Sequence, residues 1–302
     1  MKIALCFIIN YDHILNKEEI WRQWIEYNKD IINVYFFYKD ILKIKSKWIL
    51  QHALPSNYIY NTTYFNVIPA YVSLMRYALQ DSDNLWFSFL TESCCPIMSP
   101  TKFRYLFFNK YNQSILNWKK AWWNIDYHKR ANLKLLSTDL RLANDPYFIL
   151  KREDVITCLQ FIRYNHVISN TIIKGGLSNE SLFAIALQYH NKLPNVICKS
   201  THMVDWTRMM TPTSPYLFEN ADEKNCQFIE ENKKNNKYNI FIRKISKDFP
   251  DDVLSYYIYK YSKKEDDHLM ILPLFYYKKN IYWYGLIFTS IISLFLYYKY
   301  KV

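Results

Sequence analysis

The sequence predicts an α/β domain with a mostly parallel sheet, because strand-like apolar runs alternate with segments of helical spacing. The most marked run covers residues 86–91, and its nearly unbroken apolar and aromatic character is typical of a strand buried on both faces of a parallel sheet. The run ends abruptly at Glu92 and Ser93. Ligands of open α/β sheets bind beyond the carboxyl ends of the strands, so a substrate is expected here, although an ordinary polar turn after a central strand would give the same pattern.

Residue spacing assigns the remaining elements in chain order. Apolar runs of strand length predict strands at 3–9, 34–38, 58–65, 147–150, 196–199 and 240–245. Helical spacing of apolar residues predicts helices at 18–27, 68–80, 100–108, 152–164 and 178–190. The helix at 68–80 also has Pro69 in its first turn, where proline is tolerated. The polar stretch 109–144 is expected to be a long connection with some helix.

The composition excludes several function classes. The chain has 302 residues, enough for one large domain or two small ones, and only 3 glycines. Neither GxGxxG nor GxxxxGK[ST] can be built from them, so a bound diphosphate would have to be held by side chains or helix ends. The 6 cysteines have no CxxC pair and no zinc-binding spacing. The net charge of +12 suits anionic partners, but there is no long lysine run, so a nucleic-acid partner is not expected.

Residues 281–298 differ from the rest of the chain. They are apolar or aromatic apart from one threonine and two serines, carry no charge, and are flanked by lysines. The length is just sufficient to cross a bilayer, so a single-pass C-terminal transmembrane anchor is predicted, with a buried helix as the alternative. Residues 1–10 fit a first strand better than a signal peptide. The chain is therefore expected to comprise a folded domain at 1–250, a connecting segment at 251–280 and the anchor.

A predicted helix start carries the first candidate catalytic residue. Gly175 and Gly176 precede an N-cap at Ser178 or Asn179, which places Glu180 in the first helical turn. The positive helix end favours the ionised carboxylate, and an ionised carboxylate at a pocket edge can act as a general base. Acidic residues also favour this turn for stability alone, so the pattern leaves both interpretations open.

Three further groups could bind a substrate. Asp205 and Trp206 follow a possible strand and could bind the hydroxyls and the face of a sugar, or could be a turn aspartate and a core tryptophan. Arg243 and Lys244 are adjacent cations at a strand end that could neutralise a diphosphate, or a solvated basic pair. Arg130 ends a stretch of tryptophans and cations that is either a surface connection or part of an acceptor groove.

Six short segments, in this order, resemble motifs of the core-2/I-branching glycosyltransferase family, especially its plant-type relatives. They are a first strand at 2–7, a Ser-Glu-Ser-Cys-x-Pro-like motif at 91–96, WF-x-x-x-R at 147–152, DE(H/Y) at 179–181, (Y/V)VDW at 203–206 and FARKF at 241–245. Each motif is weak, but six in the family's order are hard to attribute to chance. Asn179 stands where the family has Asp, and Ser181 where it has an aromatic residue or His, and both departures bear on the choice of donor sugar.

The resemblance implies a GT-A-like fold for residues 1–250 and an inverting sugar transfer from a UDP-sugar, with no metal ion or other cofactor. By the same analogy, Glu180 is the catalytic base. The donor-binding residues would be Arg243, Lys244, Glu92 and Ser93. The acceptor-binding residues would be Asp205, Trp206 and Arg130.

The sequence thus predicts a membrane-anchored glycosyltransferase that moves N-acetylglucosamine, or else xylose, to a hydroxyl of a glycan or glycoprotein. Insertion of the C-terminal anchor after synthesis would leave the catalytic domain on the cytosolic side. The alternative is a catalytically silent membrane protein that keeps the fold as a binding or assembly module. Asp81 and Asp83 match the DxD that holds a metal in many sugar transferases, but they precede the central strand and are interpreted as a turn.

Overall fold

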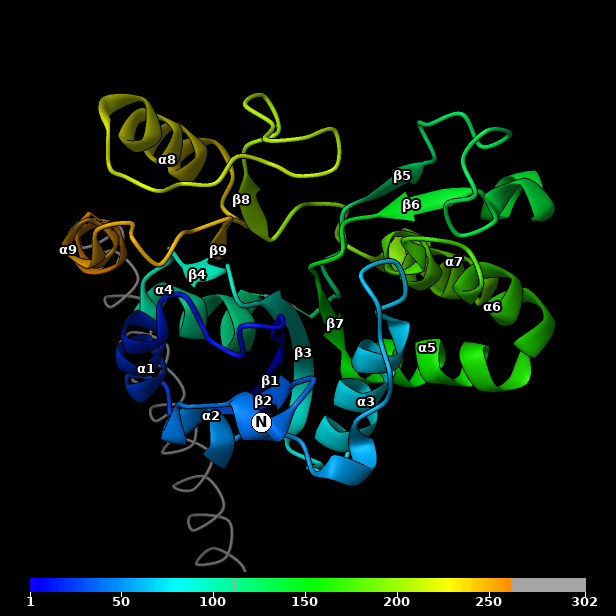
Figure 1. The fold of residues 1–302 in the computed structure, drawn as a ribbon, viewed down its shortest axis with the longest axis horizontal. Coiled ribbons are helices and arrows are strands. Elements are labelled where there is room, and N and C mark those ends of the chain that lie inside the picture. The colour runs from blue at the N-terminus through cyan, green and yellow to red at the C-terminus, as the bar shows by residue number, and fades with distance from the viewer. Residues whose placement is uncertain (111, 262–302) are drawn as a thin grey trace, which may run out of the picture.

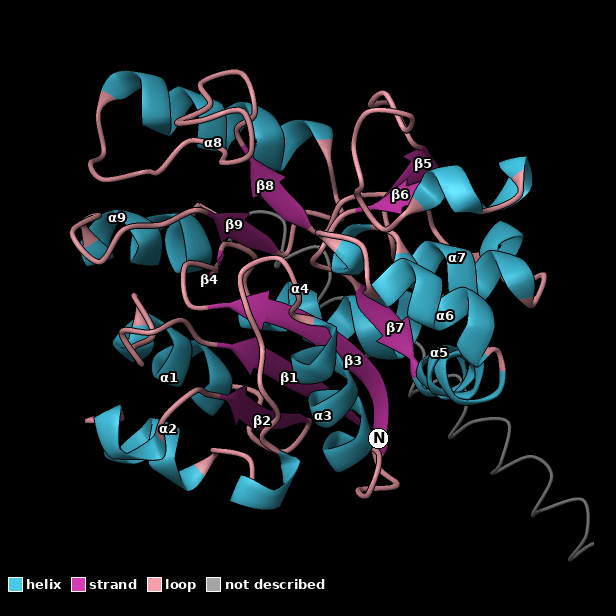
Figure 2. Ribbon diagram, turned by 45° about the vertical axis from the view of Figure 1, so that its right-hand side comes forward, coloured by secondary structure: helices cyan, strands magenta, loops and turns pink. Residues whose placement is uncertain are grey.

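The computed structural model describes residues 1–110 and 112–261 of the chain, and its centre is a four-stranded sheet with the order β2-β1-β3-β7 (Figures 1 and 2). The strands are β1 (Lys2–Ile8), β2 (Ile32–Phe37), β3 (Asn84–Thr91) and β7 (Ile149–Lys151). β1 pairs in parallel with both β2 and β3, and β7 runs antiparallel to β3. The predicted α/β class with a mostly parallel sheet is therefore confirmed, and it is compatible with a GT-A-like fold.

Helices cover both faces of this sheet (Figure 2). They are α1 (Glu18–Glu26), α2 (Lys47–Gln51), α3 (Ile68–Ala78), α4 (Pro100–Tyr105), α5 (Arg152–Tyr164), α6 (His166–Ile173), α7 (Leu182–Tyr189), α8 (Glu223–Asn235) and α9 (Asp251–Ser255). Single turns of 3₁₀ or π geometry occur at Ile41–Lys43, Ser56–Tyr58, Leu106–Lys110, Leu133–Leu135, Thr138–Leu140, Ser178–Glu180, Leu193–Asn195 and Tyr256–Lys260.

Two small sheets lie beyond one end of the central sheet (Figure 1). One has the order β4-β9-β8 and is built from β4 (Cys95–Pro96), β8 (His202–Val204) and β9 (Phe241–Arg243). The other pairs β5 (Trp118–Lys120) with β6 (Leu142–Asn144). In Figure 1 the first sheet, with α8, and the second sheet, with α7, stand on opposite sides of β3 and β7. They place loops distant in sequence around the ends of the central strands.

The side chains of β1 alternate between two hydrophobic clusters, as the pleat of a strand requires. Leu5 and Phe7 pack in the cluster that contains Trp21 of α1, whereas Ala4 and Cys6 pack in the cluster formed with α3, α5 and α7. All four β1 side chains are completely buried. Burial on both faces explains why the strand appears in the sequence as a continuous apolar run.

Two predicted strands are absent from the described part of the chain. At 58–65, the structure has a 3₁₀ turn up to Tyr58 and an isolated bridge from Thr63 to Asn66. Tyr64 and Phe65 are exposed, so the aromatic content of this segment does not reflect a sheet position. At 196–199, Ile197 forms only an isolated bridge, because no neighbouring strand continues the pairing.

The predicted helix at 178–190 is interrupted. Ser178–Glu180 forms a 3₁₀ turn, Ser181 has φ −147°, and α7 begins only at Leu182. Glu180 therefore lies in a separate turn just before α7, where its position depends on contacts with other elements.

The folded domain, expected to end at residue 250, continues through residue 261. Leu254 and Ile258 are completely buried in the cluster that contains Trp21. The rest of the predicted connecting segment, 262–280, and the predicted anchor at 281–298 lie outside the described residues. In the two described ranges, every helix is too short or too polar to span a bilayer.

Candidate active site

The loops that follow three strands meet at one edge of the central sheet. β2 and β3 lie on opposite sides of β1, so the edge between β1 and β3 is the topological switch point, where open α/β sheets bind ligands. The Asn16 amide, in the loop after β1, donates to the Glu92 carbonyl after β3 at 3.0 Å, and its side-chain Nδ2 donates to the Ile245 carbonyl after β9 at 2.7 Å. The Ile245 amide in turn donates to the Ser93 carbonyl at 2.8 Å. The polar end of β3, singled out in the sequence, thus lies beside the end of β9.

Strand pairing brings the two other predicted segments to this edge. β9 pairs antiparallel with β4 and parallel with β8, and Val204 lies opposite Arg243. Asp205 and Trp206 therefore leave β8 next to the point where Arg243 and Lys244 leave β9. The two pairs are far apart in sequence, and the pairing of β8 with β9 brings them together.

Arg243 contacts the end of β3 directly. Its Nη1 donates to Thr91 Oγ1 and, at 3.2 Å, to Ser93 Oγ. Its guanidinium lies 4.7 Å from the centre of the Tyr147 ring, within the range of a cation–π interaction. A guanidinium keeps its charge at any pH that the protein meets, so Arg243 is a fixed positive charge held by hydroxyls and an aromatic ring.

Lys244 is the second cation of the predicted pair. Its Nζ donates to Ser214 Oγ at 2.9 Å. Burial and then the charge of Arg243 lower the pKa of Lys244, while the carboxylate of Glu92 opposes the shift. Glu92 is half-buried, and its charge faces both cations. The amine of Lys244 is therefore held close to both Arg243 and Glu92.

Glu180 lies on the other side of this edge and forms an ion pair with Arg130. Arg130 Nη2 is 3.6 Å from Glu180 Oε2, and the two side chains are 23% and 26% exposed. Arg130 also lies 4.8 Å from the centre of the Trp123 ring. Burial raises the pKa of Glu180 above its ordinary value; the charge of Arg130 opposes this, Asp145 adds to it, and Arg243 opposes it. The pKa of Glu180 is thus closer to neutral pH than that of an exposed glutamate.

The turn that holds Glu180 is joined to the Arg130 loop through the backbone. The Ala131 amide donates to the Gly176 carbonyl at 2.8 Å. Three non-glycine residues of these two loops, Ala131, Asn132 and Leu177, have left-handed φ values of 48°, 49° and 53°. This conformation costs a residue with a side chain about 1 kcal/mol, and such residues cluster at functional sites where the surrounding structure enforces them.

Three side chains near Glu180 and Arg243 were not predicted as site residues. Tyr147 is 5% exposed, and burial raises its pKa to about 12 despite the nearby Arg243. The ring of His202 lies 4.7 Å from that of Tyr147 and 5.0 Å from that of Phe241. Burial, and to a lesser degree Arg243, lowers the pKa of His202 well below its usual value, so it is neutral at physiological pH.

The third is Asp145, which precedes β7. Its Oδ2 accepts a hydrogen bond from Asn117 Nδ2 at 3.1 Å, and burial raises its pKa. In the sequence, the turn-forming residues 144–146 would have placed this carboxylate in a turn before a strand. Nothing in the sequence indicates that it approaches Glu180.

Asp205 and Trp206, predicted together as acceptor-binding residues, differ in their surroundings. Trp206 is 47% exposed, whereas Asp205 is 1% exposed. Asp205 Oδ1 accepts hydrogen bonds from the Thr207 amide and hydroxyl at 2.8 and 2.7 Å, and Oδ2 accepts one from Arg208 Nε at 2.6 Å. The chain's own donors therefore occupy the carboxylate of Asp205.

Over residues 1–110 and 112–261, no three His, Cys, Asp or Glu side chains are grouped so that they could hold a metal ion. Asp81 and Asp83 lie at the start of β3, away from the site, where the Asp83 amide donates to Asp81 Oδ1 at 2.9 Å and the Lys2 amide donates to the Asp83 carbonyl at 2.6 Å. The interpretation of this DxD as a turn is confirmed.

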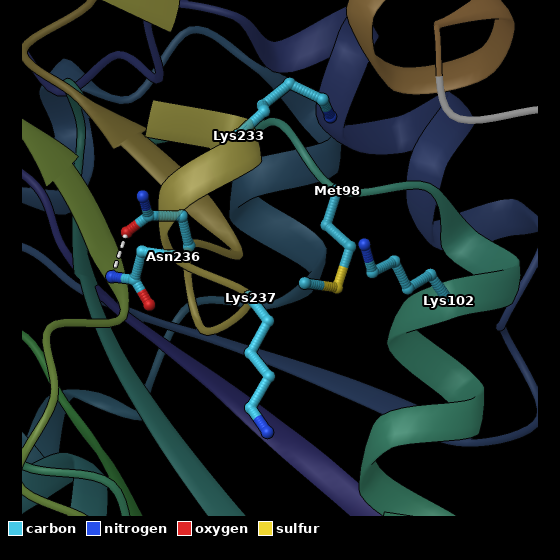
Figure 3. Close-up of a pocket in the computed structure, with 6 residues that line it drawn as sticks. Met98, Lys102, Lys233, Asn236 and Lys237 are labelled. Atoms are coloured by element: carbon cyan, nitrogen blue, oxygen red, sulfur yellow. Dashed lines mark hydrogen bonds between the residues drawn. The ribbon is translucent and has the colours of Figure 1, made fainter. Parts of the chain in front are cut away.

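A small basic pocket lies at the opposite end of β8 and β9 (Figure 3). Lys233 Nζ, on its rim, donates to the backbone carbonyls of Ile97 and Tyr257 at 2.7 and 3.2 Å. Figure 3 shows the side chains of Lys233 and Lys237 extending away from each other. The lysines of the pocket do not converge on a common point, and neither Glu180 nor Arg243 lines the pocket.

Comparison with protein-family models places much of the chain in one family. The family model described as core-2/I-branching enzyme matches residues 33–233, and no curated protein matches the chain. The matched range runs from β2 into α8 and includes Glu92, Ser93, Arg130, Glu180, Asp205 and Trp206, whereas Arg243 and Lys244 lie beyond its end. Since this range covers more than half of the chain, the chain belongs to the core-2/I-branching enzyme family of glycosyltransferases.

Proposed function

We propose that the chain is an inverting, metal-independent glycosyltransferase that moves a sugar from a UDP-sugar to a hydroxyl of a glycan or glycoprotein. The proposed sugar is N-acetylglucosamine, or else xylose. The observation that carries the proposal is the position of a partly buried carboxylate, Glu180, near a fixed cation, Arg243, at the switch point of the sheet. An inverting transfer needs a base on one side of the sugar and charge stabilisation for the leaving group on the other.

In the proposed reaction, Glu180 accepts the proton of the acceptor hydroxyl as its oxygen bonds to the anomeric carbon. The bond from that carbon to the diphosphate breaks, and its electron pair leaves with UDP. Arg243 and Lys244 stabilise the charge that develops on the diphosphate. Arg130, 3.6 Å from Glu180, favours the ionised carboxylate that the reaction requires.

We propose roles for the flanking residues as well. Glu92 and Ser93 would lie beside the donor, since Ser93 Oγ already orients Arg243. The exposed ring of Trp206 would stack on the acceptor sugar. We also propose that the apolar segment 281–298 attaches the enzyme to a membrane with the catalytic domain on the cytosolic side.

Replacement of the base tests the proposal. Glu180→Gln keeps the size of the side chain but cannot accept the proton, so we expect transfer to fall by about 10²-fold or more with UDP affinity unchanged. UDP release from a panel of UDP-sugars, with and without EDTA, measures transfer, and calorimetry measures UDP binding. Because Glu180 has a raised pKa, the acidic limb of the wild-type rate profile should lie above the ordinary glutamate value of about 4.3.

Glu153→Gln is the matched control, because the Glu153 side chain is 62% exposed and pairs with Lys151. It should leave transfer unchanged. If Glu180→Gln turns over as fast as the wild type, Glu180 is not the base. If the wild type binds no UDP-sugar at all, the catalytically silent binding module is the better description, and if EDTA abolishes transfer, the reaction is not metal-independent.

A further inference from the structure

Asn144, at the end of β6, joins the two segments that carry the carboxylates of the site. The side chain is 5% exposed, and each of its polar atoms has a partner. Nδ2 donates to the carbonyl of Asp145 at 2.8 Å and to the carbonyl of Asn179 at 2.9 Å, and Oδ1 accepts from the amide of Ala184 at 3.1 Å. One amide group thus contacts the loop before β7, the turn of Glu180 and the first turn of α7.

The bond to Asn179 acts on the peptide group that precedes Glu180. The carbonyl of Asn179 belongs to the peptide plane whose nitrogen is that of Glu180, so a hydrogen bond to this oxygen fixes the orientation of the plane. The Glu180 amide donates to the Leu177 carbonyl at 3.0 Å. The backbone on the N-terminal side of Glu180 is therefore held at both polar groups of that peptide, one of them by Asn144.

The bond to Ala184 replaces a local helix cap. The amides of the first helical turn lack partners within the helix and are usually satisfied by an N-cap side chain. Ser181 occupies the N-cap position of α7, but its hydroxyl makes no capping bond and is buried without a partner among the described residues. Asn144 supplies the acceptor instead, across 40 positions of sequence. Both sides of Glu180 are thus fixed by the same side chain.

The remaining bond, to the Asp145 carbonyl, connects the Asn144 side chain to the segment that leads into β7. The carbonyl of Asp145 precedes Pro146, whose own carbonyl accepts a hydrogen bond from the Tyr71 hydroxyl at 2.6 Å. Tyr147, the next residue, faces Arg243. Asn144 therefore connects the turn of the proposed base with the segment that contacts the cation of the donor side.

We propose that Asn144 is a positioning residue for sugar transfer, because its amide holds the Asn179–Glu180 peptide and the start of α7 against the Asp145–Tyr147 segment. The inference rests on the proposed function of Glu180 as the base. A general base must be within hydrogen-bond reach of the proton that it accepts, and a displacement of about 1 Å at such a group can cost about 10²-fold in rate. Since Asn144 is buried and its amide group is bonded to the chain's own backbone, we propose that it acts through Glu180 and not by contact with the substrate.

Asn144→Ala removes all three bonds without adding bulk. We expect kcat to fall by about 10- to 100-fold, while the KM for the UDP-sugar and the affinity for UDP change by less than about threefold, because Thr91, Ser93 and Arg243 keep their contacts. Hydrogen exchange gives a readout that needs no activity. The Ala184 amide loses its acceptor and should exchange faster in the variant than in the wild type.

Asn84→Ala is the matched control. Asn84 is completely buried at the start of β3, at the far end of the sheet from Glu180, and its Nδ2 donates to the Ala78 carbonyl at 2.8 Å and to the Tyr35 hydroxyl at 3.0 Å. The control should lower stability to a similar degree but leave kcat within about twofold at a temperature at which both variants are folded.

The outcomes separate the inference from the proposed function. If Ala184 exchanges faster in Asn144→Ala but kcat matches the Asn84→Ala control, Asn144 is only structural and the inference is wrong. Unchanged exchange at Ala184 also overturns it. If the wild type transfers no sugar from any donor, the proposed function fails and a positioning role in transfer fails with it, whereas the exchange result still decides whether Asn144 holds the turn.

Discussion

Asp205 and Trp206 are neighbours in the sequence, but their side chains have opposite environments. Burial opposes ionisation of Asp205, and the hydrogen bonds from Thr207 and Arg208 outweigh it, so its pKa lies below the ordinary value. The ionised carboxylate thus organises the loop after β8, and Arg208, held by it, lies 4.0 Å from the centre of the Tyr216 ring. Trp206 is left as the side chain of this pair that can reach an acceptor.

Neutralising Asp205 should destabilise the fold in a pH-dependent way. Asp205→Asn loses the charge that its donors require, and hydrogen bonds to charged groups contribute about 1.5–3 kcal/mol each, so we expect a loss of about 2 kcal/mol at pH 7. A carboxylate whose pKa is depressed in the folded state stabilises the fold above its unfolded pKa of about 3.9, and this contribution disappears as the pH falls through the folded pKa. Urea unfolding at pH 7 and at acid pH measures the difference.

Asp126→Asn is the control for the same chemical change at an exposed carboxylate. The Asp126 side chain is 73% exposed and lies 3.3 Å from Lys134, and an exposed pair of this kind contributes about 0–1 kcal/mol. Equal losses for the two variants at pH 7, or a loss for Asp205→Asn that does not shrink in acid, would contradict the role given to Asp205.

At the scale of elements, the sequence is informative where a segment is buried along its whole length. Strands β1, β2 and β3 were predicted because each is a long apolar run, which identifies a strand without knowledge of its tertiary contacts. The end of β3 could be located for the same reason, and with it Glu92 and Ser93. The broad placement of Arg243 and Lys244 at a strand end was also predicted.

The details of the site depend on contacts that no local pattern encodes. The 3₁₀ turn of Glu180 and the first turn of α7 are both hydrogen-bonded to Asn144, which is distant in sequence. The approach of Asp145 to Glu180 and the burial of His202 between two rings arise from the pairing of very short strands, whose propensity is dominated by their tertiary neighbours.

The contact between the Arg130 loop and the Glu180 turn should fail when Gly175 gains a side chain. A Cβ at Gly175 would lie 2.6 Å from Ala131 Cα, which real Cβ atoms do not tolerate, so the two loops must separate. We expect Gly175→Ala to destabilise the fold by about 1–3 kcal/mol, the usual cost of overpacking, and to lower kcat by displacing Glu180 from Arg130. Thermal unfolding and UDP release measure the two effects.

Gly176→Ala is the adjacent control. A Cβ there has one near neighbour, Phe65 Cδ1 at 3.8 Å, which is ordinary van der Waals contact. This variant should keep both its melting temperature and its kcat. If the two alanine variants behave alike, the close approach of the loops does not control the site.

At the scale of the whole molecule, Lys17 joins the beginning of the folded chain to its end. It lies between β1 and α1, its side chain is 4% exposed, and its Nζ donates to the carbonyls of Lys247 and Phe249 and to Asp251 Oδ1 at 2.7 Å. These acceptors follow β9 and lie beyond residue 233, where the family match ends. The Lys17 ammonium thus binds the segment that follows Arg243 and Lys244 to the loop after β1. Asn16 of the same loop contacts Glu92 and Ile245.

Removal of this ammonium should loosen both segments together. Lys17→Met keeps the aliphatic stem but leaves two carbonyls without their donor. A buried carbonyl without a partner costs about 1–3 kcal/mol, so we expect the free energy of unfolding to fall by about 2–4 kcal/mol and the melting temperature by several degrees.

The control is Lys29→Met, which removes an exposed ion pair with Glu26 at 2.5 Å and should change stability by less than about 1 kcal/mol. Because Arg243 and Lys244 directly precede the fastened segment, Lys17→Met should also weaken UDP binding in calorimetry. Unchanged UDP affinity at a temperature where the variant is folded would show that the donor side is held by β9 and Ser93 alone.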